Sequence, residues 1–349
     1  MKTAYVKAPF QFKFEDIPVP KCGRNEALIK VMACGVCGSD MNAARIEAED
    51  WQSFGHEITG VVMETGENVD HVKVGDSVLV ESGSYCGTCA QCRNGRPDLC
   101  TSGTGLFQWK ICGFTEYMTL DKQCLIPFDP EKIGYAQGTV IEPMGVALDL
   151  FYTADIKFQD DVAVVGLGPI GLMALRLAKA AGARNVYGVV RNRKNTARIQ
   201  LAKEFGATDI IYTDETLLEE YPFPNGGVDK IMVTAPPNII ASTFRAANLG
   251  AVIAYIGIDY GERGTISFDA NYFHYKKLQL RASYAVPALY FPRCMELIQA
   301  GVIDVDKMVT STFPLEDLEK AMCTLRDDKE KEIKMVMVRP ELLDEKSRN

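Results

Sequence analysis

Apolar and polar positions follow two different patterns along the chain. Over residues 1–152, short runs with alternating apolar and polar side chains are separated by glycines, as in half-buried strands. The clearest runs are ALIKVMACG at 27–35, ITGVVMETG at 58–66 and DSVLVESG at 76–83. This pattern predicts a β-rich domain with irregular loops.

From residue 160 onward, apolar strand-like runs alternate with helical ones. VAVVG at 162–166 precedes a glycine turn, an apolar helix over 172–182 and a strand over 185–190. A strand, a helix and a strand within ~30 residues form the parallel crossover unit, so we expect a doubly wound sheet and an α/β plus β fold. The further expected elements are helices at 198–207, 239–249 and 291–301 and strands at 209–213, 229–234, 251–258 and 334–338.

Length and charge narrow the class of protein. The chain has 349 residues, and at ~150 residues per domain it has room for about two domains. The net charge of −8, from 38 basic and 46 acidic residues, disfavours nucleic acid and anionic membranes as partners. The N-terminus has no apolar core of a signal peptide, and no stretch reaches the length of a membrane span, so we expect a cytoplasmic protein.

Four of the eleven cysteines lie close together in the run CGTCAQCRNGRPDLC. Thiols are reduced in the cytoplasm, so this spacing indicates metal binding rather than disulfides. The short gaps let the thiolates converge on one tetrahedral ion, and four ligands leave no open position. We therefore expect a structural zinc site, with an iron–sulfur cluster or free thiols as alternatives. The ligands would be Cys86, Cys89, Cys92 and Cys100.

A second set of metal-binding side chains is dispersed along the chain. Cys37 lies in MACGVCGSD, His56 in FGHE and Glu142 in VIEPMG. A thiolate, an imidazole and a carboxylate leave a fourth position open for water or substrate, which distinguishes a catalytic zinc from a structural one. These three residues therefore predict a catalytic metal site.

A glycine-rich turn predicts a dinucleotide site. Gly166, Gly168 and Gly171, with Pro169 and Ile170 between them, form G-x-G-x-x-G. The motif lies between an expected strand and an expected helix, which is the context that phosphate binding requires. We also place Ile256 and Gly257 in the cofactor site.

The residues after the second strand of this unit indicate which cofactor is preferred. Nineteen residues after Gly171 stands Val190, where an acid would bind the ribose of NAD. Basic residues follow at Arg191, Arg193 and Arg198. Cations suit the 2′-phosphate of NADP, so we expect NADP to be preferred, with NAD possible; a basic face in solvent is the alternative.

These motifs together resemble the zinc-dependent medium-chain dehydrogenase/reductase family. The likeness extends from GVCGSD and GHE through the four cysteines, IEPMGVAL and the glycine turn to VTSTFPLEDLEKAM. It implies a GroES-like catalytic domain with both zinc ions over 1–152, a Rossmann domain over 153–286, and a C-terminal segment, 287–349, that returns to the first domain. Because Glu142 stands where alcohol dehydrogenases have a second cysteine, the chain is most similar to the polyol and threonine dehydrogenase branch.

The resemblance also implies roles for residues around the catalytic zinc. Glu57 can enter the zinc shell, although we expect Glu142 to be the more important ligand, and Asp40 supports the site. Ser39 matches the hydroxyl that accepts the substrate proton. Asn42 stands where relatives have a histidine that passes the proton on, which leaves the exit route open.

The function that follows is hydride transfer between NAD(P) and a secondary hydroxyl or ketone of a polyol, sugar or small alcohol. An NADPH-dependent ketone reductase of the same fold is the first alternative. A zinc-ribbon binding protein is the second, but residues 86–100 carry a net charge of only +1, from two arginines and one aspartate. We expect two zinc ions per chain, a small-molecule substrate, and a homodimer or homotetramer.

Overall fold

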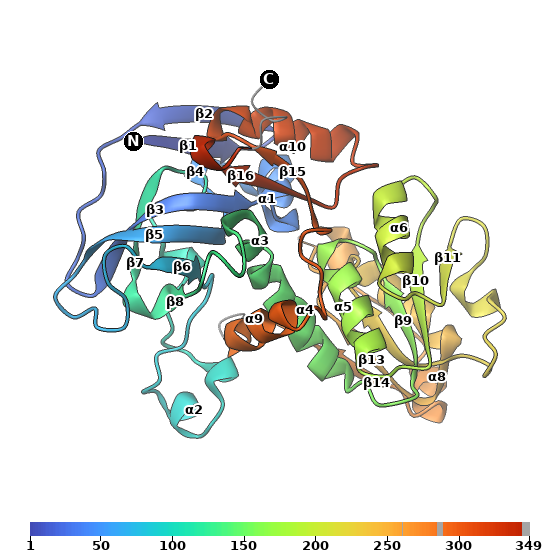
Figure 1. The fold of residues 1–349 in the computed structure, drawn as a ribbon. Coiled ribbons are helices and arrows are strands. Elements are labelled where there is room, and N and C mark those ends of the chain that lie inside the picture. The colour runs from blue at the N-terminus through green and yellow to red at the C-terminus, as the bar shows by residue number, and fades with distance from the viewer. Residues whose placement is uncertain (260, 285–288, 344–349) are drawn as a thin grey trace. The chain divides into compact units, whose positions relative to one another are not determined.

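The computed structural model describes residues 1–259, 261–284 and 289–343 (Figure 1). The chain forms two compact units. Unit 1 comprises Met1–Gly145, Val286–Gln299 and Asp304–Asn349, and unit 2 comprises Val146–Ala285 and Ala300–Ile303. The domain boundary expected between residues 286 and 287 lies outside the described residues.

The main sheet of unit 1 is built around β3 (Glu26–Gly35), which pairs antiparallel with three other strands. Most of β3 is buried, because its neighbours come from both early and late parts of the chain. The main sheet has the order β15-β16-β3-β5-β6-β8, with β7 beside β3, and a smaller sheet has the order β2-β1-β4. The other strands are β1 Lys2–Lys7, β2 Gln11–Asp16, β4 Gln52–Ser53, β5 Glu57–Thr65, β6 Ser77–Val80, β7 Tyr117–Asp121, β8 Leu125–Pro127, β15 Val309–Phe313 and β16 Lys334–Val338.

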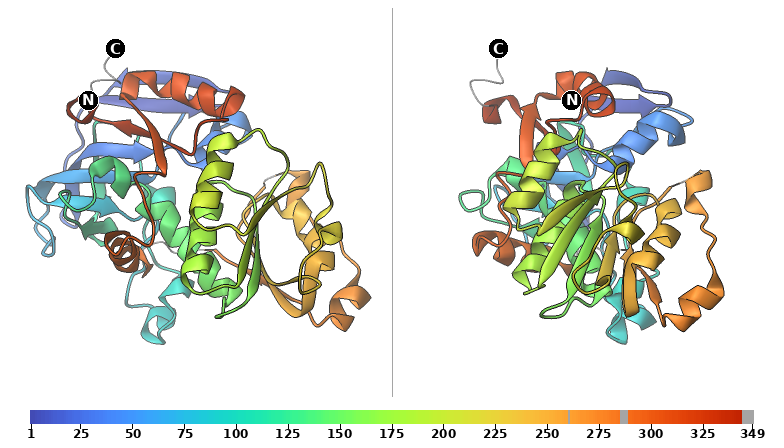
Figure 2. Two further views of the ribbon diagram at one scale, coloured as in Figure 1. Left: turned by 45° about the vertical axis from the view of Figure 1, so that its right-hand side comes forward. Right: turned by 90° about the vertical axis from the view of Figure 1, so that its right-hand side faces the viewer.

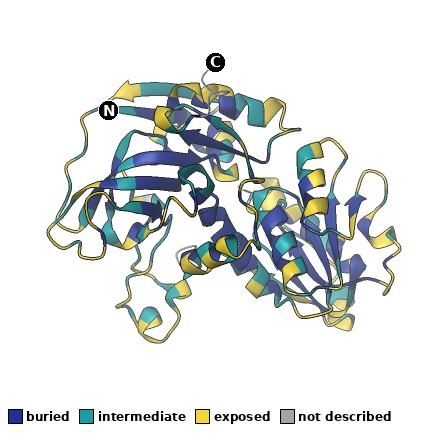
Figure 3. Cartoon of the chain, viewed as in Figure 1, coloured by how far each residue is buried: buried dark blue, intermediate teal, exposed yellow. Residues whose placement is uncertain are grey.

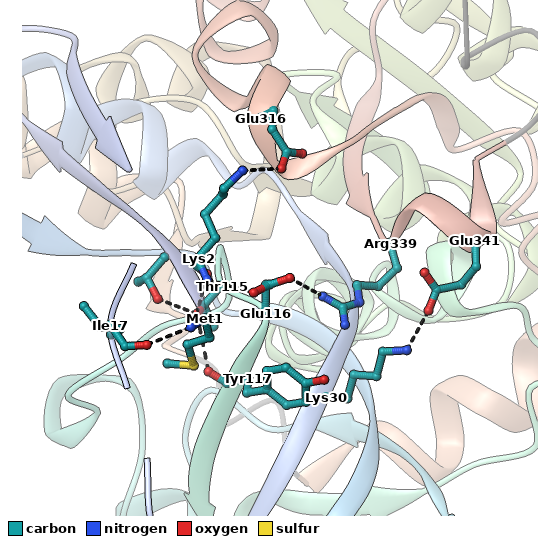
Figure 4. Close-up of polar contacts among 11 residues, drawn as sticks. Met1, Lys2, Ile17, Lys30, Thr115, Glu116, Tyr117, Glu316, Arg339 and Glu341 are labelled. Carbon is teal, nitrogen blue, oxygen red and sulfur yellow. Dashed lines mark hydrogen bonds and ion pairs between the residues drawn. The ribbon is translucent and has the colours of Figure 1, made fainter. Parts of the chain in front are cut away.

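Ion pairs join the C-terminal segment of unit 1 to its earlier strands (Figure 4). Lys30 on β3 lies 2.6 Å from Glu341, and Arg339 lies 3.1 Å from Glu116. Each pair is partly exposed to solvent, so each contributes at most ~1 kcal/mol. The pairing of β16 with β3 therefore depends mainly on backbone hydrogen bonds and apolar burial.

Unit 2 contains a parallel sheet of six strands in the order β11-β10-β9-β12-β13-β14. Helices α5 and α6 cover one face of this sheet (Figure 2). This strand order is that of a dinucleotide-binding domain, and it confirms the predicted doubly wound sheet. The strands are β9 Asp161–Val165, β10 Asn185–Val190, β11 Asp209–Tyr212, β12 Val228–Val233, β13 Ala247–Tyr255 and β14 Gln279–Ala282.

The helices include one that sequence analysis did not predict, α4, whose 14 residues begin at Ile141. No helix in the described part of the chain is long and apolar enough to cross a membrane. The helices are α1 Gly38–Asn42, α2 Ala90–Arg93, α3 Tyr135–Gly138, α4 Ile141–Ala154, α5 Pro169–Ala180, α6 Thr196–Glu204, α7 Ile240–Thr243, α8 Ala270–Tyr275, α9 Phe291–Gln299 and α10 Leu318–Asp327.

The helix expected over 239–249 is wrong in its extent. The structure has only the single turn α7, flanked by 3₁₀ turns, and β13 begins at Ala247. The hydroxyls of Ser242 and Thr243 each donate to a carbonyl three residues earlier, at 2.7 Å. Such side-chain bonds compete with the regular helical pattern, and pairing of β13 with β12 claims the rest of the segment.

Each unit has its own hydrophobic core (Figure 3). In unit 1 the rings of Phe54 and Phe114 pack with their centroids 4.8 Å apart. In unit 2 Tyr187 and Phe223 make an edge contact at 5.0 Å. Two separate cores are what a chain of this length is expected to form.

Directly after β6, the carboxyl of Glu81 is enclosed in unit 1 with only 3% of the residue exposed. Burial raises the pKa of Glu81 to about 8, and a hydrogen bond with Ser84 opposes part of this shift. The folded chain therefore holds this proton more tightly than the unfolded chain, where the pKa is near 4.5.

We expect Glu81 to make the protein less stable as the pH rises from about 4.5 to about 8, because the folded state binds more protons than the unfolded state in this range. The loss is up to ~5 kcal/mol. Glu81→Gln should flatten this dependence in urea unfolding measured across the range, whereas Glu131→Gln, on the surface, should not. Equal slopes for Glu81→Gln and the wild type would contradict this account.

Candidate metal sites and cofactor site

The four cysteines expected to bind zinc converge in unit 1. Their sulfur atoms all lie within 4.8 Å of one another. The backbone N–H of Thr88 donates to the Cys86 sulfur and is the main cause that lowers the pKa of that thiol to about 6. Burial and the neighbouring thiols raise the pKa of Cys92 to about 12. A metal ion bound here must therefore displace protons, as at other thiolate sites.

The second cluster in unit 1 joins Cys37, His56 and Glu57. One donor atom from each lies within 4.8 Å of the other two. Cys37 precedes the first turn of α1, His56 directly precedes β5, and Glu57 begins it. His56 and Glu57 are buried. Thiolate, imidazole and carboxylate donors suit a zinc ion with an open position.

Asp40 fixes the backbone around this cluster. Its carboxylate accepts hydrogen bonds from the N–H of Cys37 at 2.8 Å and of Gly55 at 3.2 Å, and lies 3.8 Å from Nδ1 of His56. Gly55 has φ +91°, and a Cβ there would lie 2.7 Å from the ring of Phe114. Only glycine allows this close approach without strain.

Glu142 lies outside the three-residue cluster, in the first turn of α4. The carboxylate is buried and accepts a hydrogen bond of 2.5 Å from the hydroxyl of Ser82. Sequence analysis favoured Glu142 over Glu57 as the carboxylate ligand. In the structure Glu57 has a donor atom within 4.8 Å of those of Cys37 and His56, and the charge of Glu142 is among the causes that raise the pKa of His56 and of Glu57. The hydrogen bond of Glu142 with Ser82 was not predicted from the sequence.

Lys334 was also missed by sequence analysis. It begins β16, is almost completely buried, and forms an ion pair with Glu57 while donating to the carbonyl of Val36 at 2.9 Å. Burial opposes its charge, but Glu57 and Cys37 outweigh this effect and raise the pKa of Lys334. A lone lysine in the apolar run KMVMV was the available signal.

The residues of the expected proton path lie on α1. Ser39 is exposed to solvent. Asn42 accepts a hydrogen bond of 3.2 Å from Arg45 through its side-chain oxygen. This amide is therefore held by a neighbour one helical turn away.

In unit 2 the glycine-rich turn joins β9 to α5. Gly166 has φ +98°, and a Cβ on Gly171 would collide with the Gly166 carbonyl. Gly168 precedes α5 and Pro169 is its first residue, followed by Ile170. The turn therefore brings its backbone against the N-terminus of a helix of 12 residues, where N–H groups bind phosphate.

A cavity of about 870 Å³ lies at the carboxyl ends of the strands of unit 2. Gly166, Val190 and Arg191 are in its wall. Ile256 and Gly257 follow β13. Gly257 lies so close to the end of β12 that a Cβ on it would collide with the carbonyl oxygen of Ala235. Crevices at the carboxyl ends of parallel strands are where such sheets bind ligands.

Two of the other expected cofactor residues have their own neighbours. Arg193 forms a two-pronged ion pair with Glu215, at 2.6 and 2.9 Å, and lies over the ring of Tyr212 at 3.9 Å. Arg198 is half-buried on α6. Among the described residues that line the cavity, Arg191 is the basic residue from the β10–α6 connection.

Comparison with known proteins agrees with these features. The profile of the alcohol dehydrogenase GroES-like domain matches residues 23–130, and that of the zinc-binding dehydrogenase domain matches residues 169–300. A sorbitol dehydrogenase of Bacillus subtilis is 30% identical over 333 residues, covering 92% of each chain. An L-threonine 3-dehydrogenase of Bacillus velezensis is 32% identical over 328 residues, covering 91% of this chain and 93% of its own.

Solved structures share the whole fold. A chain from Escherichia coli CFT073, described as a short chain alcohol dehydrogenase in complex with NADH, has a TM-score of 0.87 at 27% identity. A zinc-binding dehydrogenase structure from Sinorhizobium meliloti 1021, bound to NADP, has a TM-score of 0.84 at 25% identity. Both likenesses cover 97% of this chain and 99% of the other.

A GroES-like β domain and a doubly wound sheet, found together with clusters of zinc-binding side chains, define a two-domain dehydrogenase. The chain belongs to the zinc-dependent medium-chain dehydrogenase family, which confirms the resemblance seen in its sequence. It is an oxidoreductase of the kind that uses NAD or NADP.

The buried pair Lys334–Glu57 predicts a large loss of stability when its cation is removed. Lys334→Met leaves a carboxylate buried without its partner, which costs about 3–5 kcal/mol. We expect this loss in urea unfolding of the chelator-treated protein. The double variant Lys334→Met with Glu57→Gln should recover much of it.

Lys30→Met is the matched control, because Lys30 pairs with Glu341 at the surface of the same unit and should cost at most ~1 kcal/mol. Equal losses for Lys334→Met and Lys30→Met would show that the buried pair does not stabilise unit 1.

Proposed function

We propose that the protein transfers hydride between NAD(P) and a secondary hydroxyl of a polyol, sugar or amino alcohol. The observation that carries this proposal is the convergence of Cys37, His56 and Glu57 on one point. The relatives named as sorbitol and L-threonine dehydrogenases act on such alcohols by their names, and both match over nine-tenths of this chain.

The three donors of the catalytic cluster fit a zinc ion, because they combine borderline-soft and hard ligands and leave room for substrate oxygen. Cys37, His56 and Glu57 would hold the zinc ion, which would supply Lewis-acid stabilisation of negative charge on the substrate oxygen, and a bound nicotinamide would supply the hydride acceptor or donor. Asp40 accepts hydrogen bonds from the backbone N–H groups of Cys37 and Gly55. These bonds keep the metal-binding atoms of the cluster directed toward one point. Ser39 accepts the proton of the substrate hydroxyl.

Charge at this site is set by the chain's own residues. Glu57 faces the ammonium of Lys334, whereas Glu142 faces the neutral hydroxyl of Ser82. In our proposal Glu57 completes the metal site, since one of its oxygens lies within 4.8 Å of donor atoms of both Cys37 and His56. Glu142 then lies beside the site, held in one orientation by Ser82.

The cysteine cluster is proposed to hold a second, structural zinc ion, because four thiols in mutual reach leave no vacancy for substrate. For the cofactor we propose NADP, since Arg191 lines the cavity that begins at the glycine turn. Following the family, we further propose a homodimer or homotetramer in the cytoplasm.

The first test is a panel of polyols, aldoses, inositols and amino alcohols, assayed with NAD and NADP by nicotinamide absorbance. We expect turnover by the wild type and two zinc ions per chain. Cys37→Ser should lose one zinc and reduce kcat/KM by ~100-fold or more, with little change in unfolding. Cys86→Ser should also lose one zinc but mainly lower stability. Full activity with one zinc per chain would refute the two-site proposal.

The second test asks which carboxylate binds the catalytic zinc. We expect Glu57→Gln to weaken zinc affinity by about 10- to 100-fold in a chelator competition, and Glu142→Gln to have a smaller effect. Glu64→Gln, exposed on the same strand as Glu57, should leave zinc affinity unchanged. A larger loss in Glu142→Gln would support the assignment that sequence analysis favoured.

A further inference from the structure

The cavity of unit 2 has four charged side chains in its wall, and they differ in what they already contact. Glu219 is bound to an arginine 3.6 Å away, and Arg263 to an aspartate 2.5 Å away. The other two are Arg191 and Asp214. Within the described ranges of the chain, neither of their side chains forms a hydrogen bond or an ion pair.

Arg191 and Asp214 stand side by side at the ends of neighbouring strands. In the parallel pairing of β10 with β11, Val190 lies opposite Tyr212. The backbone N–H of Asp214 then donates to the carbonyl of Arg191 at 3.0 Å. Parallel neighbours are ~4.8 Å apart, so both side chains leave the sheet at the same corner of the cavity, and both are exposed.

These two side chains favour opposite forms of a dinucleotide. A carboxylate accepts hydrogen bonds from ribose hydroxyls and repels a phosphate that carries a charge of about −2. A guanidinium binds the phosphate with charge-assisted hydrogen bonds. The end of β10 carries no acid, whereas Asp214 lies two residues beyond the end of the neighbouring strand β11.

We propose that Asp214 is a specificity-determining residue for the cofactor. Its carboxylate accepts the 2′-hydroxyl of the adenosine ribose and opposes the binding of a 2′-phosphate, against the attraction of Arg191. The preference for NADP is therefore smaller than Arg191 alone would give, and NAD remains usable. This inference rests on the proposed dinucleotide site of unit 2.

Arg191 is the phosphate-binding partner in this proposal because the guanidinium of Arg193 is engaged. Two of its nitrogens donate to Glu215, and its central carbon lies over the ring of Tyr212, 3.9 Å from the ring centroid. Asp214 is among the weaker charges that raise the pKa of Arg193, after Glu215 and Tyr212. Arg193 therefore lies near Asp214, but it is not among the described residues that line the cavity.

The test measures binding of 2′,5′-ADP and 5′-AMP to the full chain by calorimetry at one ionic strength. The two probes differ only in the 2′-phosphate and need no redox activity. Asp214→Asn keeps a side-chain oxygen that can accept the ribose hydroxyl but removes the charge. It should raise affinity for 2′,5′-ADP by about five- to tenfold and change that for 5′-AMP by less than about twofold. Arg191→Gln should weaken 2′,5′-ADP by about tenfold.

Two controls separate local contact from overall charge. Glu220→Gln removes an exposed negative charge and Lys194→Ala an exposed positive charge, both close in sequence and outside the described cavity wall. Each should leave the ratio of the two affinities within about twofold of the wild type. Opposite shifts in Asp214→Asn and Arg191→Gln, without shifts in the controls, support the proposal.

Two outcomes would overturn it. If both probes bind but Asp214→Asn leaves their ratio unchanged, or Glu220→Gln shifts it equally, Asp214 does not select the cofactor and the dinucleotide site stands. If neither probe binds the wild type, the proposed cofactor site fails together with the inference.

Discussion

Four charged side chains gather in one part of unit 1 with little exposure to solvent. They are Asp40, Glu57, Glu142 and Lys334. Three are acidic, and Lys334 is the cation that the folded chain itself supplies. Buried charges are tolerated only with partners, so the arrangement requires β16 to pair with β3 and deliver Lys334 beside Glu57. The last strand of the main sheet is therefore part of the surroundings of the proposed metal site as well as part of the fold.

The two metal clusters illustrate different ways of bringing ligands together. The cysteine cluster is closed by a single loop, and its sulfurs meet because the spacing is short and local. The catalytic cluster instead needs α1 and β5 to be held in register, which Asp40 does through the backbone of Cys37 and Gly55. A local site can fold around its ion, whereas a dispersed site depends on the completed sheet.

In unit 2, two neighbouring strands contribute residues to the proposed cofactor site. The glycine turn binds through backbone geometry, so its residues had to be glycine at the positions with positive φ or close contact. In our proposal, selection between NAD and NADP depends on Arg191 and Asp214, which follow the neighbouring strands β10 and β11. The proximity of Arg191 and Asp214 follows from sheet order, which connects residues that are distant along the chain.

The sequence by itself determined what depends on local spacing and period. Alternating and continuous apolar runs predicted the two kinds of sheet. The C-x-x-C spacing predicted the sulfur cluster, and the glycine turn predicted the dinucleotide-binding domain. The tertiary structure was needed to show that Glu57 has a donor atom within 4.8 Å of those of Cys37 and His56, that Lys334 pairs with Glu57, that Ser82 donates to Glu142, and that Asp214 lines the cavity with Arg191. The reason is that these contacts join segments far apart in the sequence. Lys334 reaches Glu57 because β3 pairs with both β16 and β5, and Arg191 lies near Asp214 because β10 pairs with β11. Such pairing is decided by the packing of the whole sheet, which no local pattern records.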